Sequence, residues 1–463
     1  MVHLPFSIRT NPLWEKSMNL LTSPLLTDLY QLTMMQGYVD EDMYKEAVFE
    51  FYVRSLPPSR GFLVAAGLET LLAYLEGMRF NEEELAYVAG TGRFSKGLLD
   101  YLAKFRFSGD VYAMPEGTVF FENEPVVRVV APMPEAQLIE TRLINILHFE
   151  VLIASKAARC MLAADDRAVL IDFGVRRSHG AEAGLLAARD SYMTGFAGTS
   201  TVLAEPIFGI PIFGTMAHSY VEAHEDELEA FLSFARANPN NTTLLIDTYD
   251  VHKGAEKAIE AARRLREKGI KVRAVRLDSG DLLILSKDVR HILDQAGMTD
   301  IRIFASGNLD EYAIRDLLSQ GAPIEGFGVG TKLDTSEDAP YLECAYKLME
   351  YAGTPRLKKS QGKATMPGRK QVFRQFENGM MAGDVLTIEG DEQQGSPLLA
   401  KVMSGGKRVA GQRDLKEIAA YTRSQLKALP IHFRRLETTP PYPVKVSPAL
   451  SRLGQELERR LGL

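Results

Sequence analysis

Four segments in the middle of the chain decide the fold: LLIDTYD (244–250), KVRAVRLD (271–278), IRIFAS (301–306) and EGFGVGT (325–331). Each is an apolar run that ends in polar or small residues. Between them lie the helix-like stretches AEKAIEAARRLREKG (255–269), DLLILSKDVRHILDQAG (281–297) and NLDEYAIRDLLSQG (308–321). Strands that recur every 25–30 residues with amphipathic helices between them predict βα units around a parallel sheet.

The ends of these strands favour a barrel over an open doubly wound sheet. AVLIDF (168–173) adds another strand upstream, and polar or small residues close all five strands: Asp172, Asp247, Asp278, Ser306 and Gly330. A barrel gathers such ends around one mouth, whereas an open sheet spreads them along a crevice. We therefore expect an α/β barrel.

The length and local patterns predict three parts. A chain of 463 residues exceeds the roughly 150 residues typical of one domain. We expect an α+β N-terminal domain over 1–150, the barrel as catalytic domain over 151–345, and a C-terminal extension over 346–463.

Composition excludes several classes of protein. A net charge of -6 disfavours a nucleic-acid binder, which needs a broad basic face. The two cysteines, Cys160 and Cys344, form no CxxC pair, which argues against a zinc ribbon or redox motif. MVHLPFSIRTNPLWEKSMN at the start lacks the apolar region of a secretory signal. No stretch approaches the roughly 20 apolar residues of a membrane span. We expect a cytoplasmic protein that binds neither nucleic acid nor membrane.

Two glycine-containing loops predict a phosphate site. SGNLDE (306–311) and GFGVGT (326–331) both follow apolar strands, and the first opens a helix. Small residues let the backbone approach a ligand, and free N–H groups at a helix start attract anions. The alternative, that these glycines only make tight turns, is weaker for two adjacent loops, since the last strand loops of a barrel often bind phosphate.

Two further motifs carry candidate catalytic groups. RLDSGD (276–281) places Asp278 and Asp281 beside Arg276; such carboxylates can hold Mg²⁺ or ribose hydroxyls, and arginine can hold an anion. An N-cap aspartate with a solvated arginine is the alternative reading. GTMAHS (214–219) places His218 in a turn of small residues, although a lone histidine is more often packed or solvated.

Taken together, the motifs resemble one family. LLTDLYQLTMMQGY, FEFYVRSLPPSRGF, DFGVRRSHG, GTMAHS, LLIDTYDV, VRLDSGDL, FASGNLDE and GFGVGTKL occur in the order seen in nicotinate phosphoribosyltransferases, from about residue 20 to 375. The resemblance implies a type II phosphoribosyltransferase fold, an irregular α/β barrel with an α+β domain. It also implies a homodimer with shared active sites, the C-terminal extension packing on the N-terminal domain and on the dimer partner.

The resemblance implies an activity as well. Nicotinate and 5-phosphoribosyl-1-pyrophosphate would give nicotinate mononucleotide and pyrophosphate, in the salvage branch of NAD biosynthesis. Mg²⁺ would be the cofactor and ATP a co-substrate, whose hydrolysis is coupled through a phosphohistidine.

Residue by residue, the resemblance assigns roles to the motif positions. His218 is the phosphorylated histidine, and with Asp247 and Asp278 it forms the catalytic group; Asp278 is also the expected Mg²⁺ ligand. Nicotinate would contact Phe173, Arg176, Ser200, Thr215 and Arg276, together with Tyr30 of the partner subunit. The phosphoribosyl group would be held by Asp281, Ser306, Gly307, Asn308, Gly330 and Thr331.

Ser200 bears on the choice between nicotinate and nicotinamide. In the nicotinamide-specific relatives of this family, an aspartate lies in a T-D-T stretch about twenty-five residues after the DFG motif. The matching stretch of this sequence is Thr199-Ser200-Thr201. An aspartate would accept from the amide and repel the carboxylate of nicotinate. Ser200 could instead merely line a loop.

Three rival functions remain open from the sequence: a nicotinamide phosphoribosyltransferase, a barrel aldolase or isomerase acting on a sugar phosphate, and a non-catalytic metabolite-binding protein. An aldolase normally needs a Schiff-base lysine, for which Lys332 is the nearest candidate.

Overall fold

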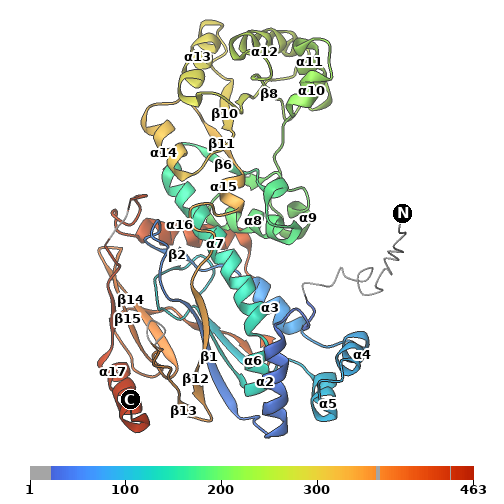
Figure 1. Ribbon diagram of the computed structural model, residues 1–463. Helices are drawn as coiled ribbons and strands as arrows, with labels where there is room; N and C mark the ends of the chain where they lie inside the picture. Colours follow the sequence, from blue (N-terminus) through green and yellow to red (C-terminus); the bar gives the residue numbers. More distant parts are fainter. Residues whose placement is uncertain (1–21, 361–364, 438–439, 463) are drawn as a thin grey trace, which may run out of the picture.

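The computed structural model describes residues 22–360, 365–437 and 440–462. The opening stretch 1–19, on which the argument against a secretory signal rests, lies outside these residues. Figure 1 shows two bodies: an upper one built around β6, β8, β10 and β11, and a lower one built from long strands such as β1 and β12. The helix α7 (Glu140–Ala164) runs from the lower body to the junction.

The upper body contains the expected parallel sheet. Its six strands are all paired in parallel in the order β7-β6-β11-β10-β9-β8. Within the described residues no ladder joins β7 to β8, so the barrel is incomplete, in agreement with the expected irregular barrel. The strands are β6 (Val169–Asp172), β7 (Gly198–Thr199), β8 (Thr243–Leu245), β9 (Ala274–Leu277), β10 (Arg302–Ser306) and β11 (Gly326–Val329).

Aspartates in the loops after three strands start the barrel helices. Asp250, Asp281 and Asp310 each accept hydrogen bonds from the first turn of the next helix, which satisfies N–H groups that have no partner inside the helix. The three helices lie close to their predicted ranges. The helical segments of the upper body are η2 (Val175–Arg177), α8 (Ala181–Thr194), α9 (Ala204–Phe208), α10 (His218–Glu222), α11 (Glu227–Ala237), α12 (Val251–Arg266), α13 (Leu282–Gln295), α14 (Glu311–Ser319) and α15 (Thr331–Asp334).

The strands of the lower body come from the parts of the sequence that precede and follow the barrel. A seven-stranded sheet has the order β13-β12-β1-β5-β3-β17-β18, so strands from before and after the barrel lie side by side. Before the barrel the chain forms α2 (Leu29–Asp40), β1 (Glu46–Val53), β2 (Leu63–Val64), α3 (Leu68–Gly77), α4 (Glu82–Gly90), α5 (Lys96–Lys104), β3 (Asp110–Ala113), β4 (Val119–Phe120), β5 (Val127–Pro132) and α6 (Met133–Leu138).

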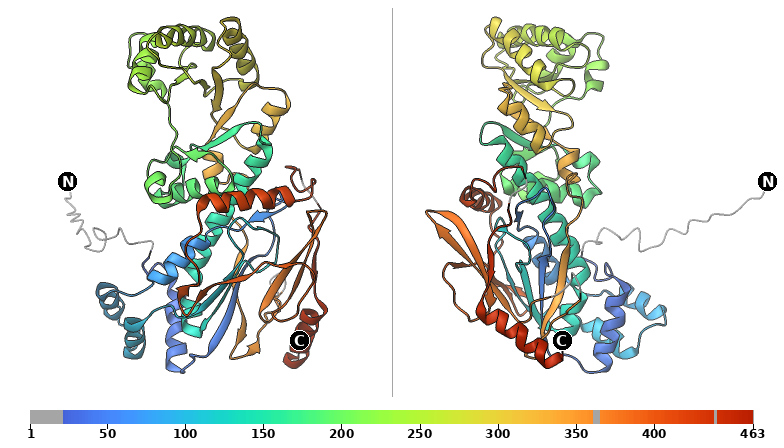
Figure 2. Two further views of the ribbon diagram at one scale, coloured as in Figure 1. Left: turned by 180° about the vertical axis from the view of Figure 1, so that it is seen from behind. Right: turned by 60° about the vertical axis from the view of Figure 1, so that its left-hand side comes forward.

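The C-terminal segment completes the lower body and reaches the barrel. Its strands β14, β15, β16 and β19 form a separate four-stranded sheet. Figure 2 shows α16 lying across the junction, where it packs against α8. The elements are β12 (Cys344–Tyr351), β13 (Thr354–Pro355), β14 (Lys370–Glu377), β15 (Met380–Ile388), β16 (Ser396–Pro397), β17 (Ala400–Ser404), β18 (Lys407–Arg408), α16 (Leu415–Ala428), β19 (Val444–Val446) and α17 (Pro448–Leu461).

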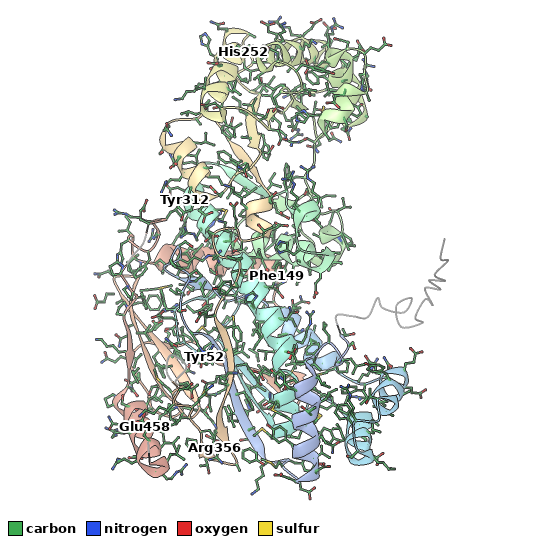
Figure 3. The ribbon with its side chains drawn as sticks, in the orientation of Figure 1. Tyr52, Phe149, His252, Tyr312, Arg356 and Glu458 are labelled. Atoms are coloured by element: carbon green, nitrogen blue, oxygen red, sulfur yellow. The ribbon has the colours of Figure 1, made fainter. Side chains whose placement is uncertain are left out.

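Each body has its own hydrophobic core, and α7 contributes to both. Tyr312 lies beside α7 near the junction, His252 at the far end of the upper body and Glu458 at the far end of the lower body (Figure 3). Although α7 has 25 residues, it buries charged side chains such as Glu150 and Lys156. No helix within the described ranges is long and apolar enough to cross a membrane.

Candidate active site

Arg276, at the end of β9, links three loops at the barrel mouth. Its Nε donates to Oγ of Ser306 at 2.8 Å, and its Nη1 donates to Oγ1 of Thr215 at 2.9 Å. Its Nη2 lies 2.7 Å from Oδ1 of Asp278. The planar guanidinium has donors for all three partners in one fixed geometry, which a lysine could not reproduce. The sequence-predicted residues Arg276, Asp278, Ser306 and Thr215 are therefore in direct contact.

Two carboxylates occupy the neighbouring strand ends. Asp247 accepts at Oδ2 from the backbone N–H of Asp278 (2.8 Å) and from the hydroxyl of Ser279 (2.7 Å). Its other oxygen, Oδ1, is buried without a hydrogen-bond partner among the described residues. Burial alone would raise the pKa of Asp278, but Arg276 and the Ser306 hydroxyl hold it below its usual value. Asp278 is therefore an anion, and Asp247 offers an oxygen that no protein group occupies.

His218 lies beside these carboxylates and remains accessible. Its Nε2 is 3.8 Å from Oδ2 of Asp278, and its Nδ1 is 3.1 Å from Oγ1 of Thr248. The side chain is 37% exposed. The two neighbours orient the ring, and its exposure leaves room for a reactant to approach.

The loop after β10 has the geometry of an anion site. Gly307 has a φ of +97°, and a Cβ there would lie 2.2 Å from the carbonyl oxygen of Asp278. Asn308 also has a positive φ, of 52°. The backbone N–H groups of Gly307 and Asn308 have no acceptor among the described residues. Unpaired N–H groups in such a turn attract an anion.

The two glycine-containing loops and the arginines line one cavity of about 430 Å³. Its walls combine cations, small residues and an aromatic ring: Phe173, Arg176, Arg177, Arg276, Asp278, Ser279, Gly280, Leu282, Ser306, Gly307, Asn308, Gly328, Gly330 and Thr331. A phosphorylated ligand suits this lining, because arginines and free N–H groups both bind phosphate.

Phe173 forms an aromatic wall of the cavity. A Cβ on Gly328 would lie 2.5 Å from the Phe173 ring, so the missing side chain lets the ring rest on β11. The guanidinium carbon of Arg276 is 5.7 Å from the ring centroid. An aromatic face with a cation beside it can hold a flat, anionic ring.

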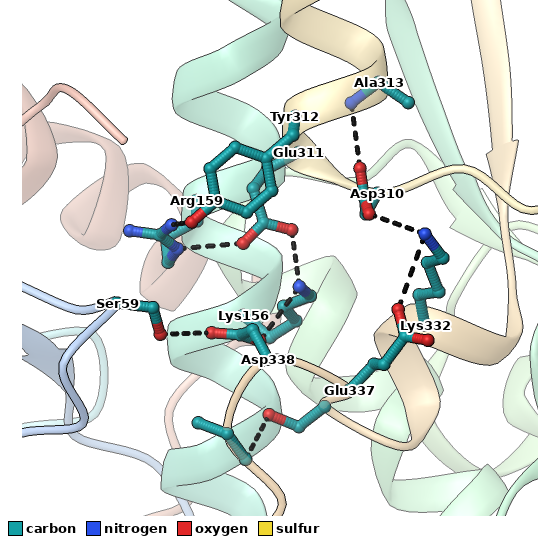
Figure 4. A network of polar contacts seen from close by, with 12 residues as sticks. Ser59, Lys156, Arg159, Asp310, Glu311, Tyr312, Ala313, Lys332, Glu337 and Asp338 are labelled. Carbon is teal, nitrogen blue, oxygen red and sulfur yellow. Dashed lines mark hydrogen bonds and ion pairs between the residues drawn. The ribbon is translucent and has the colours of Figure 1, made fainter. Parts of the chain in front are cut away.

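A lysine joins the two glycine-containing loops (Figure 4). Lys332, directly after Thr331, places its Nζ 2.8 Å from Oδ2 of Asp310, while Oδ1 of Asp310 caps α14 through the N–H of Ala313. Burial raises the pKa of Asp310, but the bond from Lys332 and the cap lower it below its usual value. The next residue, Glu311, pairs with Lys156 of α7 at 2.5 Å. The loops are therefore bonded to each other and to the central helix.

Three sequence-predicted residues lie outside this cluster. Tyr30 is on α2 in the lower body, 47% exposed and away from the cavity of its own chain (Figure 1). Asp281 caps α13 with two bonds of 3.1 Å and does not line the cavity. Ser200 follows β7, where its N–H donates to the carbonyl of Asp172 at 2.8 Å, next to the strand that carries Phe173.

Sequence reasoning missed Arg177, which lines the cavity and lies 3.3 Å from Oγ1 of Thr331. It also missed the bridging role of Lys332. The pair of adjacent arginines in DFGVRR was the available signal for Arg177, whereas the Lys332 bridge has no local signature.

An incomplete α/β barrel with two carboxylates, a histidine and a phosphate-type cavity at its mouth defines an enzyme that acts on a phosphorylated small molecule. Comparison with known proteins gives the family. Residues 25–148 match the nicotinate phosphoribosyltransferase (NAPRTase) N-terminal domain, 168–379 the NAPRTase family and 391–454 the NAPRTase C-terminal domain. The chain belongs to the nicotinate phosphoribosyltransferase family, as its motifs predicted.

Individual relatives support this assignment. Nicotinate phosphoribosyltransferase pncB2 of Mycobacterium tuberculosis is 50% identical over 425 residues, 91% of each chain. The nicotinate phosphoribosyltransferase of Bacillus subtilis is 40% identical over 379 residues, covering 80% of this chain and 76% of the relative. The crystal structure of human nicotinic acid phosphoribosyltransferase superimposes with a TM-score of 0.85 at 27% identity, covering 93% of this chain and 99% of the human one.

Proposed function

We propose that this protein transfers the phosphoribosyl group of 5-phosphoribosyl-1-pyrophosphate to nicotinate, giving nicotinate mononucleotide and pyrophosphate for NAD biosynthesis in the cytoplasm. The observation that carries the proposal is the composition of one cavity. Phe173 and two arginines at one side suit an anionic pyridine ring, and the unpaired N–H groups of Gly307 and Asn308 suit the 5-phosphate. The names of the relatives agree with nicotinate as the acceptor of a phosphoribosyl group.

The reaction needs the pyridine nitrogen in line with C1 of the ribose. Stacking on Phe173, with the carboxylate directed to Arg176 or Arg276 and near Thr215 and Ser200, fixes the orientation of the ring. The C1–O bond to pyrophosphate breaks while the bond from the ring nitrogen to C1 forms. Positive charge develops on the ribose, and the anionic Asp278 with Asp247 stabilises it.

The residues at the mouth fit a magnesium ion. Oδ1 of Asp247 is buried without a partner among the described residues, and Oδ2 of Asp278 has His218 as its neighbour at 3.8 Å. Mg²⁺ in transferases is usually bound by one or two carboxylates together with substrate phosphates. Asp278 and Asp247 would hold it, and when bound it supplies charge neutralisation for the departing pyrophosphate.

We assign the coupling to ATP to His218. A ring nitrogen takes the γ-phosphoryl group as the bond to ADP breaks, and the phosphohistidine is later hydrolysed. The 37% exposure of the imidazole and its position beside Asp278 support this role. Coupling to ATP hydrolysis through His218 would supply free energy that shifts the equilibrium of the transfer toward the mononucleotide.

A homodimer would complete the site. Tyr30 is exposed together with Leu26 and Leu29 on the same segment of the lower body, which suits a covered surface. We expect Tyr30 of the partner subunit to close the nicotinate pocket over Phe173. Mixing Tyr30→Ala chains with His218→Ala chains should restore part of the ATP-stimulated activity that each variant alone lacks, because one site of a mixed dimer is intact. No recovery after verified subunit exchange would contradict shared sites.

The protonation state of Lys332 disfavours the alternative function as an aldolase. The bond to Asp310 raises the pKa of Lys332, so this amine is held as a cation rather than as the neutral nucleophile that a Schiff base needs.

Product analysis tests the proposal. Labelled nicotinate, 5-phosphoribosyl-1-pyrophosphate and Mg²⁺ should yield labelled nicotinate mononucleotide, and ATP should increase the yield. Absence of the mononucleotide under both conditions, with a folded protein, would refute the function. Equal yields with and without ATP would refute only the coupling.

A further inference from the structure

Two buried carboxyl groups lie behind the wall formed by Phe173. Asp172, at the end of β6, and Asp334, at the end of α15, are 0% and 1% exposed. Asp172 precedes the loop that carries Phe173 and Arg176. Asp334 is three residues after Thr331 of the second glycine-containing loop. Asp172 and Asp334 therefore adjoin the two loops that the proposed function assigns to nicotinate and to the 5-phosphate.

The loop from 173 to 178 is wrapped around this pair. Asp172 accepts from the N–H of Gly174 at 2.8 Å and from the hydroxyl of Thr199 at 2.6 Å. Asp334 accepts at Oδ2 from the hydroxyl of Ser178. A Cβ on Gly174 would lie 2.1 Å from Cγ of Asp334, so the carboxyl group occupies the space that a side chain would fill.

One carboxylate oxygen of Asp334 lacks a hydrogen-bond partner. Oδ1 of Asp334 is buried and has no hydrogen-bond partner when both groups are treated as carboxylates. Burial and the nearby Asp172 raise the pKa of Asp334 well above its usual range. Protonation of Asp334 would turn this oxygen into a donor for Asp172 and so give it a hydrogen-bond partner.

We propose that Asp334 is a positioning residue which, hydrogen-bonded to Asp172 as a neutral acid, holds the Phe173–Arg176 loop against the Gly330–Thr331 loop. The inference rests on the proposed function, because it assigns the two loops to the two substrates. The positioning role is distinct from the roles that the family resemblance gives to residues at the barrel mouth, since neither Asp172 nor Asp334 lines the cavity.

Charged side chains on the elements that pack against α15 line the cavity or pair with other groups. α15 packs against η2, α7 and α8. Arg176 and Arg177 of η2 line the cavity, Arg142 of α7 pairs with Glu182 of α8, and Lys156 of α7 pairs with Glu311. Beside burial, the charge that raises the pKa of Asp334 is that of Asp172.

Three variants test the proposal. Asp334→Asn keeps a neutral N–H donor for Asp172 but cannot titrate, whereas Asp334→Ala removes the donor. Glu267→Gln is the control, because it removes an exposed carboxylate at the C-terminal end of α12. We expect Asp334→Ala to lose about tenfold to a hundredfold in kcat/KM for both substrates, the size of effect that a displacement of about 1 Å can cause. Asp334→Asn should stay within about threefold of the wild type at neutral pH.

The pH profile separates positioning from mere packing. As pH rises, Asp334 of the wild type loses its proton, the two anions repel each other and kcat/KM falls; Asp334→Asn should not show this alkaline loss. Unchanged kcat/KM in Asp334→Ala would overturn the proposal, as would identical alkaline profiles of the wild type and Asp334→Asn.

Thermal unfolding measured as a function of pH tests the neutral acid pair of Asp334 and Asp172 independently of catalysis. It applies even if Asp334→Ala does not fold or if nicotinate is not the substrate. A raised folded-state pKa gives stability that is complete below the unfolded pKa and is lost as pH rises through the folded pKa. The Tm of the wild type should therefore fall relative to that of Asp334→Asn as pH rises, whereas Glu267→Gln should follow the wild type. Parallel Tm curves for the wild type and Asp334→Asn would overturn the neutral acid pair.

Discussion

Nη2 of Arg276 lies 2.7 Å from Oδ1 of Asp278, two residues further along the chain, and the hydroxyl of Ser306 donates to the same oxygen. This arrangement keeps Asp278 ionised and directs its second oxygen toward His218. The same guanidinium reaches Thr215. Arg276 therefore holds the carboxylate, the histidine loop and the phosphate loop in one geometry.

Replacing Arg276 tests that geometry. Arg276→Lys keeps the positive charge but loses the fork of donors, so bonds to Ser306, Thr215 and Asp278 cannot all form. Hydrogen bonds to charged groups are worth about 1.5–3 kcal/mol, which corresponds to a loss of about 10- to 100-fold in kcat/KM. Steady-state kinetics of Arg276→Lys with nicotinate measure this loss of kcat/KM.

Arg273→Lys is the matched control, because Arg273 precedes the same strand and is exposed. It should retain wild-type kcat/KM. A wild-type value for Arg276→Lys would show that the fork of hydrogen bonds is dispensable.

His218 should gain a phosphate from ATP. Its exposed ring beside Asp278 motivates the prediction. Intact-mass measurement at neutral to alkaline pH, where phosphohistidine survives, should show one added phosphate on the wild type and on His252→Ala, and none on His218→Ala. His252 is an exposed histidine on α12 at the far end of the upper body (Figure 3) and so serves as the control. Phosphate on His218→Ala would move the modified site elsewhere.

The bond between Lys332 and Asp310 should matter mainly for phosphate binding. Asp310→Asn keeps an acceptor for the α14 cap and removes the charge that pairs with Lys332. We expect KM for 5-phosphoribosyl-1-pyrophosphate to rise about three- to tenfold, with a smaller change in kcat, since a partly exposed ion pair is worth about 1 kcal/mol. Asp250→Asn, at the equivalent cap of α12 and away from the cavity, should leave KM unchanged. Equal KM values for all three proteins would contradict the bridge.

Much of the barrel could be predicted from local signals. The apolar runs that end at Asp278 and Ser306, and the helices that follow them, lie where the periodicity placed them. Arg276 and Asp278 were chosen for their residue types at a strand end, and the structure brings them into contact. Strand ends are informative because a parallel sheet collects them at one edge.

Other features depend on contacts that are distant in the sequence. The gap between β7 and β8 depends on how the whole sheet curves, which no local pattern records. Asp334 in TKLD looks like a solvated charge until α15 packs it against Asp172, 162 positions earlier. Asp281 was expected to bind the phosphoribosyl group, yet its side chain caps α13, the alternative that the sequence left open.

Ser200 is the residue that we expect to bear on substrate choice. It follows β7 beside the strand end that carries Phe173. Ser200→Asp would place a carboxylate near that of nicotinate, and like charges at short range in a partly dry pocket repel strongly. We expect the ratio of kcat/KM for nicotinate over nicotinamide to fall by about tenfold or more. Ser319→Asp, which adds the same charge on the exposed end of α14, should leave the ratio unchanged. A similar ratio in both variants would show that Ser200 has no part in substrate choice.

The ratio of kcat/KM for nicotinate to that for nicotinamide, measured on the wild-type protein with 5-phosphoribosyl-1-pyrophosphate, Mg²⁺ and ATP, tests the assigned function most directly. Arg176 and Arg276 with Phe173 form a cationic, aromatic wall that suits a carboxylate-bearing ring. We predict a strong preference for nicotinate, by about a hundredfold or more, because its carboxylate can accept charge-assisted hydrogen bonds from the arginines of this wall, whereas a neutral amide cannot form an ion pair with them. A preference for nicotinamide, or equal values for the two rings, would contradict it.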